Sequence, residues 1–106
     1  MKNGIYFVTF SSNNNDVGQG TVVVQDNAIN GGDFGFTYQG RVQGDKLDLH
    51  VSQHNPQAVN VIQGVNNYTM EMLIGETQNG YVLSGAVRGI PQAQLRVTAK
   101  FIGDLI

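Results

Sequence analysis

Apolar and polar residues alternate one by one along several short stretches of the chain. The apolar members of the three clearest stretches are Leu47, Leu49 and Val51, then Tyr68, Met70, Met72 and Ile74, and finally Leu95, Val97, Ala99 and Phe101. Only Leu73 breaks the alternation. Because only a β-strand turns every second side chain to one face, these stretches predict strands with one buried face. No stretch has the sustained apolar spacing of an amphipathic helix, so we expect no long helix.

Residues that favour turns, mainly Gly and Asn, separate the strand-like stretches. The predicted strands are 4–11, 19–25, 27–30, 34–42, 46–52, 58–63, 67–75, 80–88 and 94–102. Residues 55–59 are expected to form one short turn. Asn79-Gly80 lies between two alternating stretches and favours a type I′ hairpin turn, which needs positive φ at both of its central residues.

Eight or nine short strands in a chain of 106 residues must protect their edges from other chains. A closed barrel and a pair of stacked sheets both do this, and the alternation alone leaves the two open. A chain of this length buries roughly 65% of the surface that its unfolded form exposes, which is enough for one core without disulfides or a structural metal. The sequence has no cysteine, so disulfides and thiolate chemistry are excluded. We therefore expect a single all-β domain over residues 1–106.

Charged residues are scarce, at 13% of the chain, and the formal net charge is −2. The six basic residues are scattered along the chain rather than clustered: Lys2, Arg41, Lys46, Arg88, Arg96 and Lys100. Direct DNA binding needs clustered cations that meet phosphates, so this distribution argues against nucleic-acid contact. Polarity rests instead on 11 Asn and 10 Gln residues, which repel one another weakly and favour self-association.

No segment resembles a signal peptide or a membrane helix, which needs roughly 20 apolar residues. We therefore expect a cytoplasmic protein without membrane contact. Candidate chemistry is sparse. His50 and His54 lack a nearby carboxylate or thiolate and make a poor metal site. Asp48 and Glu71 are expected to be solvated, and no Ser–His–acid set stands out. We expect neither an enzyme nor a cofactor.

The aromatic and methionine residues are the candidates for the interior of the domain. They are Phe7, Phe10, Phe34, Phe36, Tyr38, Met70, Met72, Tyr81 and Phe101. The interior of an eight-stranded barrel is either filled by side chains or holds one small ligand. If it is hollow, its expected lining is Phe7, Phe36, Tyr38, Met70, Met72 and Phe101. A carrier or sensor of a small apolar ligand is therefore one hypothesis for the function.

Several short motifs, in order along the chain, resemble the GrlR family. They are 1–6 (Met-Lys-Asn-Gly-Ile-Tyr), 18–20 (Gly-Gln-Gly), 29–33 (Ile-Asn-Gly-Gly-Asp), 38–40 (Tyr-Gln-Gly), 50–51 (His-Val), 87–89 (Val-Arg-Gly) and 99–102 (Ala-Lys-Phe-Ile). The family consists of negative regulators of type III secretion genes in Gram-negative pathogens. The matching pieces span nearly the whole chain, although each is short.

The resemblance implies a small, closed, antiparallel, lipocalin-like barrel of eight strands, with an internal hydrophobic cavity. It also implies a homodimer that sequesters a helix-turn-helix transcriptional activator by protein–protein contact. That mode of action agrees with the scattered basic residues, which argue independently against direct DNA binding. A regulatory binding protein is therefore the second hypothesis, and the one we favour from the sequence.

One stretch departs from the family pattern. The best-known member carries a Glu-Asp-Glu-Asp motif after its Tyr-Gln-Gly, and that motif matters for regulation. The equivalent stretch here, 42–48, is shorter and has only Asp45 and Asp48 as acids, with Lys46 between them. The resemblance assigns partner contact to these three residues. Two carboxylates offset by a lysine attract a basic partner weakly, so a regulator with a different target stays open.

Overall fold

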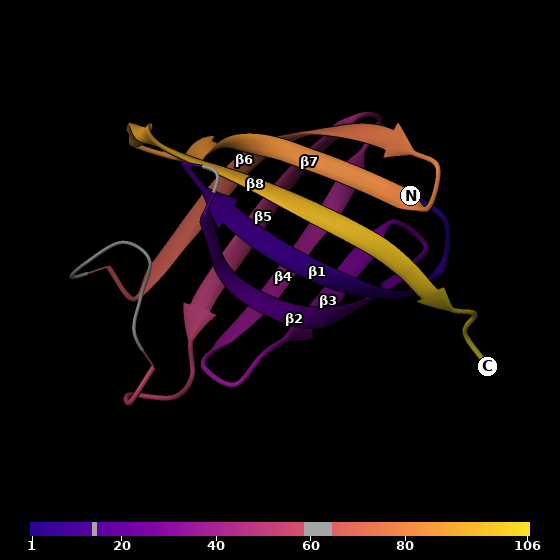
Figure 1. Cartoon of the computed structure of the whole chain (residues 1–106), viewed down its shortest axis with the longest axis horizontal. Helices are drawn as coiled ribbons and strands as arrows, with labels where there is room; N and C mark the ends of the chain where they lie inside the picture. Colours follow the sequence, from indigo (N-terminus) through magenta and orange to yellow (C-terminus); the bar gives the residue numbers. More distant parts are fainter. Residues whose placement is uncertain (14, 59–64) are drawn as a thin grey trace.

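The structure is a computed structural model that describes residues 1–13, 15–58 and 65–106. Eight antiparallel strands follow one another: β1 (Gly4–Ser12), β2 (Asn15–Gln25), β3 (Ala28–Gly32), β4 (Phe36–Gln43), β5 (Lys46–Gln53), β6 (Asn67–Thr77), β7 (Gly80–Val87) and β8 (Ile90–Gly103). Each strand pairs with the next, and β8 pairs with β1 to close a barrel (Figure 1). The described residues contain no helix. The predicted all-β closed barrel of eight strands is confirmed.

The strand predicted at 58–63 falls almost entirely outside the described residues. Ala58 itself lies in a turn, where its N–H donates to the carbonyl of Asn55 at 3.0 Å. The strand predicted to begin at residue 34 begins instead at Phe36. The carboxylate of Asp33 accepts hydrogen bonds from the N–H groups of Gly35 (2.8 Å) and Phe36 (2.7 Å) and so holds the chain in a turn before the strand starts.

The type I′ turn lies in a different hairpin from the one predicted. Asp26 and Asn27 join β2 to β3, and both have positive φ, 52° and 64°. In the β6–β7 hairpin Thr77 pairs with Gly80, so the loop consists of residues 78 and 79, neither of which has positive φ. The hairpin predicted at Asn79-Gly80 is therefore confirmed, but its type I′ turn was wrong. Gly80 belongs to the strand ladder, where an added Cβ would lie 2.0 Å from the carbonyl oxygen of Ala99.

Every strand sends alternate apolar side chains into one core. Tyr6, Val8 and Phe10 are buried from β1, and Leu47, Leu49 and Val51 from β5. Leu73, which breaks the alternation, lies outside and is 54% exposed. Two aromatic residues predicted for the interior are also outside. Phe7 is out of phase with Tyr6 and Val8 and is 37% exposed, and Phe34 is 75% exposed in the turn before β4.

Side chains fill the barrel interior. Of the expected cavity lining, Tyr38, Met70 and Met72 are buried in the core, and Phe36 and Phe101 are partly buried against it. Phe7 faces outward, so its placement in a cavity was wrong. Two voids that core residues line measure about 20 Å³ and 40 Å³. A void of roughly 10–15 Å³ holds one water, whereas small-molecule sites run to roughly 300–1,000 Å³. These voids therefore have room for water only.

Candidate functional site on the barrel exterior

The outer face of β1, β2 and β8 carries four apolar residues, Ile5, Phe7, Val23 and Ile102, which we term the apolar wall. Ile5 lies directly opposite Val23 in the β1–β2 ladder. Ile102 is 53% exposed and occupies a bulge, because Ile5 pairs with Gly103 while Tyr6 pairs with Phe101. Phe7 is 37% exposed, and Ile5 and Val23 are partly buried, so the four side chains present apolar surface to solvent.

Asp48, Glu71 and Arg88 form a charged cluster on another part of the exterior. Asp48 of β5 and Glu71 of β6 are directly opposite in the ladder, an arrangement that is unfavourable for like charges. Arg88 follows β7 and offsets the repulsion by binding both carboxylates. Its Nη2 donates to Asp48 Oδ2 at 2.8 Å and its Nε to Glu71 Oε2 at 3.1 Å. Hydrogen bonds to Glu71 and then to Asp48 raise the pKa of Arg88 above its ordinary value.

The geometry leaves the charged cluster accessible. The side chains of Asp48, Glu71 and Arg88 are 63%, 57% and 53% exposed. The N–H of Arg88 donates to the carbonyl of Thr69 at 2.8 Å, so the backbone that carries the guanidinium is fixed to β6. Asp48 and Glu71 carry two negative charges and Arg88 one positive charge, and Arg41, directly opposite Asp48 on β4, adds a second positive charge beside them. The cluster therefore presents charges of both signs at the surface.

The three residues assigned to partner contact lie close together at and just after the β4–β5 turn. Asp45 and Lys46 are exposed at the β4–β5 turn, where Gly44 has φ of +63°. Asp48 lies two residues further along β5, with Arg41 opposite it on β4. The structure adds Glu71 and Arg88, which the sequence had not joined to Asp48. No local motif signals that contact, because Arg88 is 40 residues from Asp48 along the chain.

The two histidines belong to separate polar contacts. His50 Nδ1 lies 3.3 Å from Thr69 Oγ1 on the neighbouring strand. His54 Nε2 lies 2.9 Å from the carbonyl oxygen of Asp33. Across 1–13, 15–58 and 65–106, no three His, Cys, Asp or Glu residues are close enough to hold a metal ion. Each imidazole therefore serves a pairwise contact at the described surface.

Asp33, Tyr38 and Tyr68 form a polar group at one mouth of the barrel. The phenol of Tyr38 donates a hydrogen bond to the carboxylate of Asp33. Burial, followed by this hydrogen bond, raises the pKa of Tyr38 far above its usual range. Burial and then the charge of Asp33 raise the pKa of Tyr68 to about 12. Both phenols stay neutral near pH 7, and the hydrogen bond from Tyr38 to Asp33 joins β4 to the turn that precedes it.

Comparison of the chain with protein-family models and with curated proteins finds no match. The resemblance to the GrlR family therefore rests on the sequence motifs quoted above. Within the described part of the chain, no helix combines the length and the apolar character needed to cross a membrane.

Proposed function

We propose that the protein is a non-catalytic regulator of the GrlR type, which acts in the cytoplasm by binding a transcriptional activator. The observation that carries the proposal is the contrast between a filled interior and an exterior with two different surfaces. The inner voids of about 20 Å³ and 40 Å³ leave the outside of the barrel as the place for binding. The apolar wall and the charged cluster suit two separate protein contacts.

The apolar wall is the proposed homodimer contact. β1 has β2 and β8 as its neighbours, so β5 and β6 lie across the barrel from it (Figure 1). A two-fold dimer uses the same patch on both subunits, and an apolar patch is self-complementary where a charged one is not. Pairing through the apolar wall leaves the charged cluster of each subunit facing outward. Asp48 and Glu71 offer two exposed carboxylates to a basic surface, and DNA-binding activators carry such surfaces.

The homodimer is tested by light scattering on the purified chain and on Phe7→Gln. We expect a dimeric mass for the parent chain and a shift towards monomer for the variant, because a polar amide replaces the exposed ring at the wall. Phe34→Gln is the matched control, since Phe34 is more exposed but lies in the turn before β4. A monomeric parent, or equal behaviour of the two variants, contradicts this part of the proposal.

The regulatory role is tested in the source cell with the double variant Asp48→Lys/Glu71→Lys. Affinity capture with the parent protein should recover a transcriptional activator, and deletion of the gene should raise expression of the activator's targets. The double variant should lose the capture and fail to restore repression. Asp16→Lys/Asp104→Lys is the control, with two reversals at exposed carboxylates away from the cluster. The proposal fails if no activator is recovered and deletion leaves expression unchanged.

A carrier of a small apolar ligand is the alternative function. The filled interior argues against it, because ligand entry would require the core around Met70 and Met72 to open. Native mass spectrometry of the protein from its source, with titration of a fluorescent lipophile, distinguishes the two functions. A stoichiometric bound lipid would favour the carrier.

A further inference from the structure

Three Asn-Gly dipeptides occur in the chain, at Asn3-Gly4, Asn30-Gly31 and Asn79-Gly80. The carboxamide of an asparagine can be attacked by the backbone nitrogen of the next residue. Glycine leaves that nitrogen unhindered, because it has no Cβ. The three dipeptides are chemically identical and differ only in their surroundings, so the fold decides which of them reacts.

Asn30 lies inside the barrel wall, where reaction is blocked. It pairs with Val23 of β2 and with Gln39 of β4, so its strand has a partner on both sides. Its Oδ1 accepts a hydrogen bond from Nε2 of Gln39 at 3.1 Å. An added Cβ on Gly31 would collide with the carbonyl oxygen of Thr21, so the backbone is closely packed as well. Attack on Asn30 would require β3 to leave both ladders.

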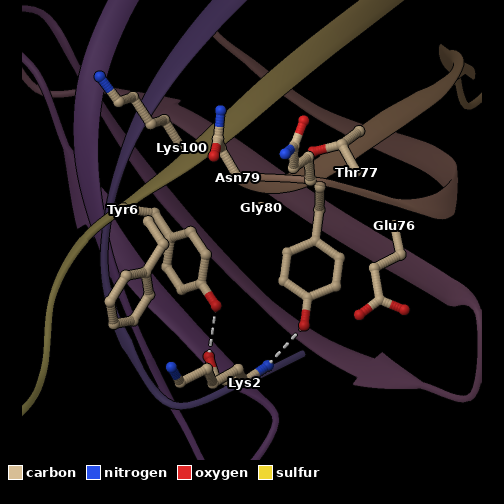
Figure 2. Close-up of a pocket in the computed structure, with 10 residues that line it drawn as sticks. Lys2, Tyr6, Glu76, Thr77, Asn79, Gly80 and Lys100 are labelled. Carbon is tan, nitrogen blue, oxygen red and sulfur yellow. Dashed lines mark hydrogen bonds between the residues drawn. The ribbon is translucent and has the colours of Figure 1, made fainter.

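Asn3 precedes β1, and its side chain is held by the neighbouring turn. Its Oδ1 accepts a hydrogen bond from the N–H of Asp26 at 2.9 Å, so the carboxamide is fixed to the β2–β3 turn. The preceding residue, Lys2, donates its N–H to the phenol oxygen of Tyr81 at 3.0 Å. Its carbonyl accepts from the phenol of Tyr6 at 2.6 Å (Figure 2). Side chain and backbone are therefore both fixed at Asn3.

Asn79 lies in the two-residue loop between β6 and β7, and its side chain is exposed. It lines a pocket of about 360 Å³ that also includes Lys2, Tyr81 and Lys100 (Figure 2). Among the residues drawn in Figure 2, none forms a hydrogen bond with its carboxamide. The loop end of a hairpin opens at a lower free energy than the middle of a sheet. The Asn79 side chain is therefore the one with freedom to approach the next nitrogen.

Packing requires glycine at position 80. Gly80 pairs with Thr77 in the β6–β7 ladder and with Lys100 in the β7–β8 ladder. An added Cβ there would collide with the carbonyl oxygen of Ala99. The close contact between the hairpin and β8 therefore keeps an unhindered backbone nitrogen next to Asn79.

We propose that Asn79 is the site at which the folded protein undergoes spontaneous deamidation. The Gly80 nitrogen gives up its proton to a base in the solvent and forms a bond to Cγ of Asn79. The bond from Cγ to Nδ2 breaks, and the nitrogen leaves as ammonia with a proton from water. Water then opens the resulting cyclic imide at either carbonyl, which gives aspartate or isoaspartate. The net reaction consumes water, releases ammonia and needs no oxidant or cofactor.

The two products affect the hairpin differently. Both add a negative charge to a pocket that contains Lys2 and Lys100. Isoaspartate also lengthens the main chain by one methylene, at the point where the carbonyl of Asn79 accepts the N–H of Phe101 at 3.0 Å. Isoaspartate should therefore displace the hairpin from β8, whereas aspartate should leave that hydrogen bond in place.

The test is incubation of the purified full chain in mildly alkaline buffer, followed by peptide mapping with mass spectrometry. Replacement of the amide by a carboxylate identifies each product, and enzymatic methylation detects isoaspartate. We expect Asn79 to react at least about tenfold faster than Asn3 or Asn30. That ratio follows if opening the other two sites costs about 1.4 kcal/mol more. In urea, where the surroundings are lost, the three sites should react at similar rates.

Two variants complete the test. Asn79→Gln keeps the carboxamide, but its longer side chain must close a larger ring, so loss of ammonia at this position should stop. Asn79→Asp carries the added charge without the added methylene, and it should resist urea better than the parent chain rich in isoaspartate. Equal stability of these two forms would contradict the displaced hairpin. The proposal is overturned if Asn3 or Asn30 reacts as fast as Asn79 in the folded chain, or if Asn79 reacts only in urea.

Discussion

Gly85 lies where the backbones of β7 and β6 leave no room for a side chain, and replacing it tests how closely the strands of the barrel wall pack. Gly85 pairs with Met72, and an added Cβ would lie 1.9 Å from the carbonyl oxygen of Glu71 and 2.9 Å from the Cα of Met72. Both obstacles are backbone atoms, so rotation of a side chain cannot relieve the contact. Gly85→Ala must therefore push the two strands apart locally.

The expected loss of stability follows from that displacement. Overpacking a core costs typically about 1–3 kcal/mol, and each ladder hydrogen bond that weakens adds about 1 kcal/mol. We expect Gly85→Ala to reduce the free energy of unfolding by about 2–4 kcal/mol, or on the order of 10–20 °C in the melting temperature. Because the clash falls on the carbonyl of Glu71, the carboxylate geometry at the charged cluster should change as well.

Gly75→Ala in the same hairpin is the matched control. A Cβ there meets only the carbonyl oxygen of Val82, at an ordinary distance of 3.7 Å. Alanine has fewer backbone conformations than glycine in the unfolded chain, so folding loses less entropy, and this variant should be about 0.4–1 kcal/mol more stable than the parent. Urea unfolding followed by circular dichroism measures both variants. If Gly85→Ala is as stable as the parent, or if the two alanines have equal effects, the close approach of the strands has been misjudged.

Three further predictions concern the core and the barrel mouth. Met70→Ala should cost about 2–5 kcal/mol in urea unfolding, since Met70 is fully buried, and a loss below 1 kcal/mol would show that the core collapses around it. Asp33→Asn should cost about 1–3 kcal/mol, because the amide nitrogen cannot accept the Tyr38 hydrogen bond, and an additional Tyr38→Phe change should recover part of that loss. Burial raises the pKa of Tyr6 and of Tyr68 to about 12, above the unfolded value of 10.0, so their stabilisation is complete below pH 10 and is lost as the pH rises towards 12. Phenolate absorbance from these tyrosines should therefore appear together with unfolding, and their ionisation near pH 10 in an intact barrel would contradict this.

Alternation along the chain predicted the strands because a barrel wall has one wet and one dry face. It failed where the local signal was ambiguous. Phe7 is as apolar as its neighbours Tyr6 and Val8, so only the register of β1 shows that its ring faces outward. Phe34 is a residue type that favours strands, but the carboxylate of Asp33 accepts hydrogen bonds from the two N–H groups that follow Phe34 and so forms a turn there. The closed barrel itself came from the family resemblance, since alternation fits a sandwich equally well.

The candidate sites were harder to predict than the strands. Asp48 was identified as a contact residue, but its pairing with Arg88 depends on how β5, β6 and β7 align across the barrel. The pocket beside Lys2 depends on the β6–β7 hairpin reaching the start of β1. Both features join residues far apart in the sequence, and periodicity carries information only about near neighbours.

The ladder between β1 and β8 joins the first strand of the chain to the last, and this affects how the barrel folds. Tyr6 pairs with Phe101, and the start of β1 lies at the same end of the barrel as the close of β8 (Figure 1). Every other ladder joins strands that are consecutive in sequence. Pairing of β1 with β8 therefore closes the longest loop, has the largest entropic cost and should be the last ladder to form during folding. Around the barrel, however, the strands form a ring with no first or last member. A circular permutant could link the two ends of the chain and open it at the exposed Gly44-Asp45 turn. It would keep all eight ladders and lose only the covalent link between β4 and β5. The pairing of β1 with β8 would then join strands that are consecutive in sequence.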